Sequence, residues 1–320
     1  MGLIENPKTY TGRDLETIFF RPIVSGANAP ELGIRMLYNM PVPTTIQLWS
    51  PQTNVLRPYS PGWNGGYTAD RKQKTISLYK VKAEVGFSAS DYFNQVYELI
   101  TGRADVSLDD LTGTELEQAE TEMFRTAIAE SLRVLMWIGD TSASTYNLFD
   151  GFIKKANSYR CKSANISRDD VAPENITSLF DTMWSMANPR LKNLKAEGHL
   201  TYYVTTDIYE AYEQYLDKMG NDHAYTDMIT GRRELSYHGI KIVDMHISHI
   251  IPTNSTTQTT LCLLTDSRNL AMAVNTSDYP GSEVRMWYNP DEMENRQRAT
   301  FMAGCEILDE ELVITTTITN

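Results

Sequence analysis

The feature that most constrains this fold is one long amphipathic segment that runs from Thr114 to Ile138. Its start fits a capping box, in which the Thr114 hydroxyl and the Glu117 carboxylate satisfy free backbone amides. Apolar residues then recur at helical spacing, at Leu116, Ala119, Met123, Phe124, Ala127, Ile128, Leu132, Val134, Leu135 and Ile138. Gly139 ends the pattern. About 25 residues at about 1.5 Å each make a rod of about 37 Å, which is typical of a structural strut.

Composition limits what can surround this helix. With 320 residues, 41% hydrophobic and 22% charged, the chain can bury a sizeable core as one elaborate domain or two coupled ones. No run approaches the roughly 20 apolar residues that span a bilayer, and the first residues lack the pattern of a signal peptide. We therefore expect a globular protein that is synthesised in the cytoplasm.

Charge and cysteine content narrow the class further. A formal net charge of −12 disfavours a protein built to grip nucleic acid, although it is compatible with a wall that encloses DNA without holding it. Cys161, Cys262 and Cys305 are too few and too scattered for a disulfide framework. We expect these thiols to be reduced and mostly buried.

The region before the long helix is predicted to be extended. Prolines at 7, 22, 30, 41 and 43 indicate an arm without a core of its own over residues 1–45. Two alternating segments follow, TIQLW from Thr45 and KTISLYKVKAEVGF from Lys74, and Asn64-Gly65 between them suits a tight hairpin turn. The apolar parity changes after Leu78, which predicts a bulge near Tyr79.

Helices and strands alternate beyond residue 170. A helix with Pro173 in its first turn precedes a strand at HLTYYVTT, a helix at DIYEAYEQYLDKMG that Gly220 closes, and a strand at GIKIVDM. Four more strand-like runs follow, TLCLLTD, EVRMWYN, ATFMAGCEI and ELVITTTIT. The pattern predicts an α+β fold with a β-rich end.

Motifs for catalysis or cofactor binding are absent: the chain contains no GxGxxG, GxxxxGK[ST], HExxH, GxSxG or CxxC. His246 and His249 form a candidate metal pair, but no cysteine or third histidine lies near them in sequence, which favours ordinary exposed or hydrogen-bonded histidines. No catalytic residue, cofactor or metal is predicted.

Three other patterns have structural interpretations. Adjacent carboxylates at 109–110, 169–170 and 310–311 are typical of loops and helix starts. Tyr209, Tyr212 and Tyr215 form a stripe typical of a core or a subunit contact. The basic run Lys72, Lys74, Lys80 and Lys82 indicates either a solvated strand edge or a surface that meets an acidic neighbour.

The order of these elements resembles the major capsid protein of tailed bacteriophages, the HK97-like fold. The strand from Leu78 to Phe87 is similar to the return of the family's long E-loop before its spine helix. GDTSASTYNLFDGFIKKA resembles the Gly-Asp end of that helix and the following aromatic-Asp-Gly-aromatic stretch, and SYHGIKIVDMHISHIIP resembles a glycine-led strand of the A-domain.

The resemblance implies a division of the chain. It comprises an N-terminal arm (residues 1–45), an E-loop hairpin (46–87), a P-domain with its spine helix (88–184, with the helix at about 114–138), an A-domain (185–280) and C-terminal strands that return to the P-domain (281–320). Inter-subunit contact candidates lie at the hairpin tip and beside it: Trp63, Asn64, Gly65, Lys72 and Lys74.

The resemblance also implies a structural protein without an active site. Copies would form hexamers and pentamers of an icosahedral virion shell around double-stranded DNA, with weak non-specific DNA contact and no membrane. Portal, scaffolding and possible decoration proteins are the implied partners. The chain has no long charged helical segment at its start, so either scaffolding is a separate protein or a precursor is trimmed, and the start at Met1 favours the first.

Two alternatives stay open. An encapsulin-like compartment shares the fold but encloses cargo enzymes, and a groove for a cargo peptide would favour it. A metal-assisted hydrolase that uses His246, His249 and nearby carboxylates belongs to a different class, and bound metal would favour it.

Overall fold

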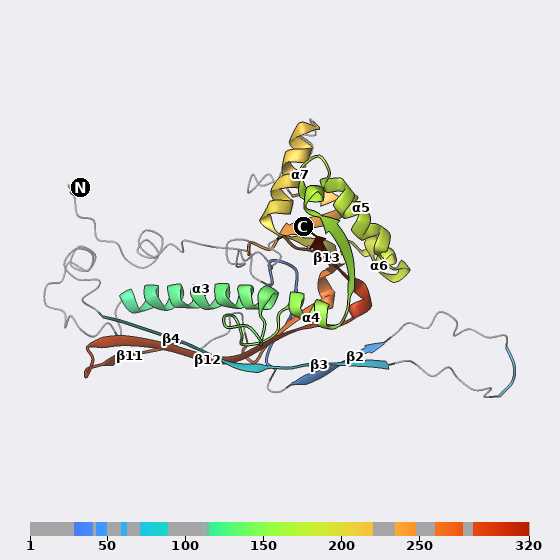
Figure 1. The fold of residues 1–320 in the computed structure, drawn as a ribbon. Helices are drawn as coiled ribbons and strands as arrows, with labels where there is room; N and C mark the ends of the chain where they lie inside the picture. The colour runs from blue at the N-terminus through green and yellow to red at the C-terminus, as the bar shows by residue number, and fades with distance from the viewer. Residues whose placement is uncertain are drawn as a thin grey trace.

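The chain forms two stacked regions and a protruding ribbon in the computed structural model (Figure 1). The structure describes residues 29–40, 43–49, 59–62, 71–88, 112, 115–219, 234–247, 260–277 and 284–319. One region, the platform, is a five-stranded sheet beneath the helix α3 (Glu115–Ile138). The other, the lobe, is a six-stranded sheet with three helices.

The platform sheet is built around one long strand, β12 (Glu294–Ile307). The first half of β12 pairs antiparallel with β11 (Val284–Asn289) and β4 (Tyr79–Ser88), and its end pairs with β10 (Leu270–Val274), which pairs in parallel with β1 (Arg35–Leu37). Alternate residues of β12 are buried on the side of α3, and Ala299, Phe301 and Ala303 join the core beneath that helix. A short helix, α4 (Phe152–Ser158), packs beside α3 and β12.

The lobe sheet is covered on both faces. Its order is β5 (Lys162–Ser167), β13 (Val313–Thr319), β9 (Cys262–Asp266), β6 (Leu200–Val204), β8 (Ile240–Asp244) and β7 (Ser236–Tyr237). Every residue of β6 and β9 is buried. Tyr202 and Leu264 pack into the lobe core, whereas Tyr203 and Leu263 point into the platform core. Burial on both faces explains why these strands have nearly continuous apolar sequences.

Three helices cover the outer face of this sheet: α5 (Ile176–Met186), α6 (Pro189–Leu194) and α7 (Thr206–Lys218). The described connections between other elements also contain short 3-10 helices, η2 (Arg168–Val171), η3 (Lys195–Glu197), η4 (Ser267–Asn269) and η5 (Glu310–Leu312). The tyrosine stripe of α7 belongs to the lobe core: Tyr212 is buried, and its ring lies 5.4 Å from the ring of Phe180. Tyr209 and Tyr215 pack against the same core, so the core interpretation is confirmed.

The ribbon is a two-stranded antiparallel sheet of β2 (Thr44–Trp49) and β3 (Arg71–Ile76), and it extends away from the platform in Figure 1. The sequence predicts one strand from Lys74 to Phe87. The structure divides it at Ser77 and Leu78 into β3 and β4, which belong to different sheets. The change of apolar parity therefore comes from a crossing between two sheets, and the predicted bulge at Tyr79 is wrong.

The long helix is confirmed at Glu115–Ile138, but its predicted stripe is only partly buried. Ile128, Leu132 and Leu135 are in the core, whereas Met123 and Ala127 are exposed. Core contacts concentrate in the second half of α3, where the lobe and platform cores meet. The predicted capping box at Thr114 lies outside the described residues. Pro173 lies in the turn before α5 rather than in its first turn.

Two features of chain organisation follow from the packing. Within the described part of the arm, Ala29, Leu32 and Ile34 are buried in the platform core of the same chain. The last strands divide between the two regions: β11 and β12 lie in the platform, and β13 pairs with β5 and β9 in the lobe. Segments far apart in the sequence meet here because β-sheet pairing is not restricted to neighbours in the chain.

Candidate functional site

The predicted contact residues lie between positions 63 and 74, and the structure describes only residues 71–74 of this span. Trp63, Asn64 and Gly65 lie outside the described residues, and for Lys72 the backbone within β3 is described but the side chain is not. Their role in subunit contact stays a prediction. Lys74 is described in full, and it lies at the base of the ribbon rather than near its tip.

Lys74 takes part in a charged cluster with the platform. Its ammonium lies 3.5 Å from the centre of the Tyr159 ring and 3.9 Å from carboxylate oxygens of both Glu306 and Glu310. Glu306 is almost fully buried, and it accepts hydrogen bonds from Lys155 Nζ at 2.7 Å and from the Tyr159 hydroxyl at 2.5 Å. The pKa of Tyr159 is raised, chiefly by burial of its hydroxyl and secondly by the hydrogen bond to Glu306. The cluster ties β3 to α4 and β12.

Just after Lys74, the backbone at the end of β3 crosses closely over strand β12. Ile76 is fully buried against Ala271, Ala273 and Leu308, and the chain then passes directly over Gly304 of β12. A Cβ atom on Gly304 would lie 2.1 Å from the carbonyl oxygen of Ser77, so only glycine fits beneath the crossing. The base of the ribbon is therefore held by burial, charge and a steric constraint within one chain.

The end of α3 is held by a second close contact between backbones. The amide of Gly151 donates to the carbonyl of Gly139 at 2.8 Å, and a Cβ atom on Gly139 would lie 2.3 Å from the carbonyl oxygen of Phe149. Asp140 accepts hydrogen bonds from the hydroxyl and amide of Ser142, which, with a bond from Lys154, lower its pKa to about 2. This geometry explains why the helix ends in Gly-Asp and why Asp-Gly follows ten residues later.

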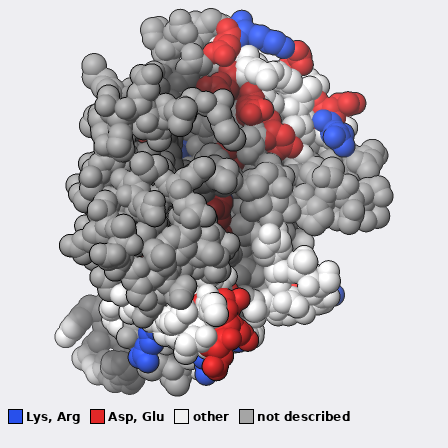
Figure 2. Space-filling view, turned by 90° about the vertical axis from the view of Figure 1, so that its left-hand side faces the viewer, with Lys and Arg blue, Asp and Glu red and all other residues white. Residues whose placement is uncertain are grey.

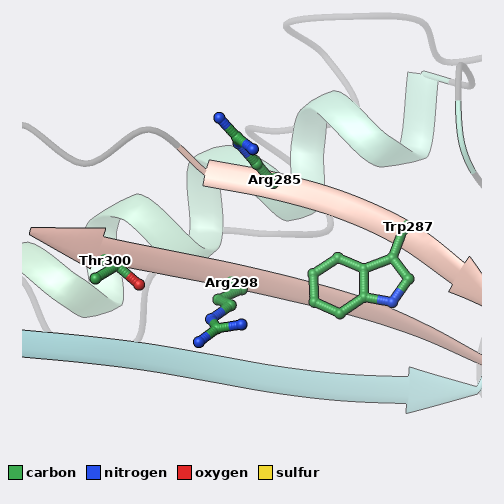
Figure 3. A pocket seen from close by; sticks show the side chains of 4 residues that line it. All are labelled: Arg285, Trp287, Arg298 and Thr300. Atoms are coloured by element: carbon green, nitrogen blue, oxygen red, sulfur yellow. The ribbon is translucent and has the colours of Figure 1, made fainter.

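The platform sheet has a second surface on the side away from α3, which we call the open face. It carries the alternate, more exposed residues of three strands, namely Lys80, Lys82 and Glu84 of β4, Arg285 and Trp287 of β11, and Arg296, Arg298 and Thr300 of β12. Arg285, Trp287, Arg298 and Thr300 line a groove of about 490 Å³ (Figure 3). The described part of the sequence therefore places basic and aromatic side chains together on a sheet face that no helix covers.

Charges on the open face contrast with the rest of the chain. Its five basic residues stand in a protein whose formal net charge is −12. Figure 2 shows acidic side chains gathered on the upper lobe and again low on the molecule. Some open-face cations have partners within the face: Lys82 Nζ lies 2.7 Å and Arg298 Nε lies 3.3 Å from Glu84. Lys80 and Lys82 belong to the basic run noted in the sequence. The arginines and Trp287 come from strands about 200 positions away, so no local pattern connects them to these lysines.

The candidate metal and carboxylate sites have ordinary structural roles where they are described. His246 Nδ1 lies 3.2 Å from an oxygen of Asp244, and His249 lies outside the described residues. Within the described ranges, no group of three His, Cys, Asp or Glu side chains could hold a metal ion. The pairs at 169–170 and 310–311 begin η2 and η5, which confirms helix starts, and 109–110 is not described.

The three cysteines are free, as predicted. Cys262 and Cys305 are buried, and Cys161 is half-buried. Burial raises the pKa of Cys161 to about 11 and that of Cys305 to about 12, so both thiols are protonated at neutral pH and are poor nucleophiles. No helix in the described residues is long and apolar enough to cross a membrane.

Comparisons with known proteins identify the fold. No protein-family model and no curated protein matches the sequence. Solved structures do match: the capsid of an empty GTA particle has a TM-score of 0.59 at 10% identity, over 98% of this chain and 95% of that one. The mature capsid of bacteriophage PhiM1 has a TM-score of 0.53 at 10% identity, over 100% and 91%.

The capsid of the cyanophage P-SCSP1u is similarly close, with a TM-score of 0.52 at 12% identity over 97% of this chain and 96% of that one. Each match extends over at least 91% of both chains. The chain has the HK97-like capsid fold, as the order of its elements predicts.

Proposed function

We propose that this chain is the major capsid protein of a tailed bacteriophage. Copies would assemble as hexamers and pentamers into an icosahedral shell that encloses a double-stranded DNA genome and forms the wall of the virion. The observation that supports this most is the likeness to phage capsid chains over 98% to 100% of the sequence. The proposed partners of such a shell are portal and scaffolding proteins, and in some shells decoration proteins.

The distribution of exposed surface supports assembly. An isolated two-stranded ribbon is marginally stable in water, and β2–β3 extends beyond the platform that anchors its base. Part of the first half of α3, including Glu122 and Met123, and the open face are exposed as well. A neighbouring copy would cover these surfaces, whereas an enzyme would need polar groups that converge on a pocket.

We further propose a functional division that follows the packing. The arm would support the platform edge, the ribbon would act as the E-loop, the platform with α3 would act as the P-domain, and the lobe would act as the A-domain. In this division the A-domain includes β5, α5 and β13 in addition to most of the predicted residues 185–280, because all three contribute to the lobe core. β10, which lies within 185–280, belongs to the platform sheet and so to the P-domain.

Electron microscopy of the purified chain, expressed with and without candidate scaffolding proteins, tests the proposed function. Closed particles of uniform size are expected. A folded chain that stays monomeric at high concentration in every such mixture would contradict the proposal. Particles that contain a host enzyme rather than DNA, when purified from the natural source, would instead support a cargo compartment.

The ribbon offers a sharper test of the same function. Replacing residues 50–70 with a short Gly-Ser turn keeps β2, β3 and the Lys74 contacts but removes the long segment that joins the two strands. The variant should stay folded by circular dichroism and should no longer form shells. Closed particles from this variant would show that the ribbon is dispensable for assembly.

A further inference from the structure

The outer surface of the lobe carries a tryptophan beside two lysines. Trp184, near the end of α5, is half-buried, and the centre of its ring lies 5.8 Å from Lys192 Nζ and 5.3 Å from Lys195 Nζ. An ammonium group is attracted to an indole at such distances, but a neutral ring leaves the positive charge in place. Two like charges beside one ring also repel each other. These three side chains, which we call the lysine–tryptophan patch, therefore suit an anionic partner.

The helix α6 holds the patch in place. It begins after Asn188, whose side chain accepts a hydrogen bond from the amide of Leu191 at 2.7 Å, and Leu191 is fully buried. Lys192 and Lys195 follow this buried residue and are three positions apart. Residues at that spacing lie on the same side of a helical segment. The two lysines are thus presented together on a short, anchored segment.

The patch lysines differ from the third cation of this segment. Arg190 is ion-paired at 3.0 Å with Asp309 and at 2.9 Å with Glu311. Within the described ranges, Lys192 and Lys195 have no carboxylate within ion-pair distance. The patch therefore retains two positive charges in a chain whose formal net charge is −12.

A surface of complementary charge lies on α7, and we call it the acidic face of α7. Glu210 is exposed and Glu213 is partly exposed, three positions along the same helix. Like charges about one turn apart destabilise a helix slightly, and neither carboxylate is ion-paired within the part of the chain that the structure describes. Figure 2, which faces the left-hand side of Figure 1, shows acidic side chains gathered on the upper lobe. A cationic partner would stabilise this face.

We propose that the lysine–tryptophan patch of one copy binds the acidic face of α7 in a neighbouring copy. Glu210 and Glu213 would meet the two ammonium groups, with the indole of Trp184 as the apolar centre of the contact. Tryptophan is among the residues that most often dominate the energy of protein–protein contacts. Complementary charges around it fix the register and disfavour other arrangements. The occupant of the patch is thus a second copy of this chain.

The two surfaces lie on different sides of the lobe. In Figure 1, α6 lies at the right-hand margin of the lobe and α7 lies on its left. A contact between two different surfaces is head-to-tail, and it closes into a ring when the rotation between copies permits. The inference rests on the proposed function, because hexamers and pentamers are rings of this kind. It adds the lobe surfaces through which the ring would form.

The alternative occupant of the patch is the phosphate backbone of nucleic acid. Affinity for nucleic acid grows with the number of phosphates that are neutralised, and two lysines neutralise few. The net charge of −12 also opposes this occupant. The acidic face of α7 offers two carboxylates for two ammonium groups, and their spacing is fixed by a helix. These features favour the second copy.

Charge reversal tests the pairing. Lys192→Glu with Lys195→Glu alters the patch, and Glu210→Lys with Glu213→Lys alters the acidic face. Each pair of substitutions should lower the yield of assembled particles at least about tenfold, because it places like charges against each other. All four substitutions together should recover most of the yield, since both signs are then exchanged. A fourfold variant that assembles no better than either pair would overturn the proposal.

Arg35→Glu with Lys241→Glu is the matched control. Both side chains are exposed and lie outside the two surfaces, and the net charge changes by the same amount as in the lysine pair. This control should leave the yield unchanged. Circular dichroism of the unassembled chains shows whether each variant is folded, so that a loss of yield reports on assembly.

Disulfide trapping detects the contact whether or not shells form. Asn193 lies between the patch lysines in sequence, Gln214 follows Glu213, and both are exposed. Asn193→Cys with Gln214→Cys should give a ladder of linked chains longer than dimers under mild oxidation, because each copy would use both surfaces. Asn193→Cys with Lys241→Cys should not. Linked dimers from either single-cysteine variant, without a ladder from the double variant, would indicate a two-fold contact and overturn the proposal.

The outcomes separate this contact from the capsid function. Ladders without shells would support the contact and contradict the capsid function. Shells that show neither a ladder nor sensitivity to charge reversal would contradict the contact alone. Duplex DNA that binds the wild type but not Lys192→Glu with Lys195→Glu, with assembly intact, would assign the patch to nucleic acid and overturn the proposal.

Discussion

The lobe and the platform are both sheet-and-helix layers, but they differ in how completely they are covered. In the lobe, β6 and β9 are buried along their whole length, with helices on one face and the platform core on the other. In the platform, α3 covers one face of the sheet and leaves the open face exposed. Both faces of the lobe sheet are therefore covered within one chain, whereas one face of the platform sheet is available for contact with neighbouring copies.

This difference indicates which changes affect the single chain and which affect assembly. Substitutions in the lobe core remove contacts made within one chain, so their cost is independent of protein concentration. Substitutions on the open face act on a surface that a neighbour would share. Stability of the unassembled chain and yield of particles are therefore separate measurements, and the following predictions use both where possible.

The largest effect is expected in the lobe. Phe180 is fully buried, with its ring 4.9 Å from Tyr202 and 5.1 Å from Tyr237. Phe180→Ala should lower the free energy of unfolding by about 3–5 kcal/mol, because it leaves a cavity among three aromatic rings. Chemical denaturation of the unassembled chain measures this. A change below about 1 kcal/mol would show that the lobe core can collapse around the lost ring.

Truncation along α3 compares the two halves of the helix. Leu132 is 1% exposed and Met123 is 39% exposed. Leu132→Ala should cost about 2–5 kcal/mol of unfolding free energy, whereas Met123→Ala should change it by less than about 0.5 kcal/mol. Equal effects at the two positions would mean that the first half of α3 is as well covered in solution as the second.

The crossing at the ribbon base is expected to be next in sensitivity. Gly304→Ala places a Cβ against the carbonyl of Ser77, so the crossing must shift at a cost of about 1–3 kcal/mol. Gly86→Ala is the matched control, because its Cβ would meet the flexible end of Glu294. Thermal unfolding compares the two variants, and a stable Gly304→Ala chain would show that the ribbon base can move freely.

Lys74 tests the charged part of the same anchor. Lys74→Met removes the contact with the Tyr159 ring and two carboxylates and should cost about 1 kcal/mol. Lys80→Met, on the open face, should be nearly neutral in the unassembled chain. If the Lys74 contacts set the direction of the ribbon, the particle yield of Lys74→Met should be lower than that of Lys80→Met. Equal yields would show that these contacts are not needed for assembly.

The smallest effect concerns pH and the loop after α3. The pKa of Asp140 is lowered from its ordinary value of 3.8 to about 2, so its ionised form is favoured in the folded chain. Its contribution to stability is present above about pH 4 and is lost as the pH falls toward 2. The melting temperature of Asp140→Asn should therefore lie below that of the wild type at pH 6 and converge with it near pH 2. A constant difference across this range would contradict the assignment.

Much of the local structure is predictable from the sequence. The spine helix, the strand runs of the lobe and the end of α3 at Gly139 follow from periodicity and glycine placement, which act over neighbouring residues. The break at Ser77 appears in the sequence as a change of parity, but whether a bulge or a crossing causes it depends on Gly304, more than 200 residues away. No local signal contains that information.

The same separation holds for function. The sequence by itself determined the order of elements, because each element is specified by contacts between residues a few positions apart. This order, through its resemblance to a known family, predicts the capsid fold. Only the tertiary structure decided that Lys74 anchors the ribbon, that β13 joins the lobe, and that Arg285, Trp287 and Arg298 share one groove. Each of these depends on which strands pair, and strand pairing is fixed by long-range burial and hydrogen bonding that a linear pattern does not specify.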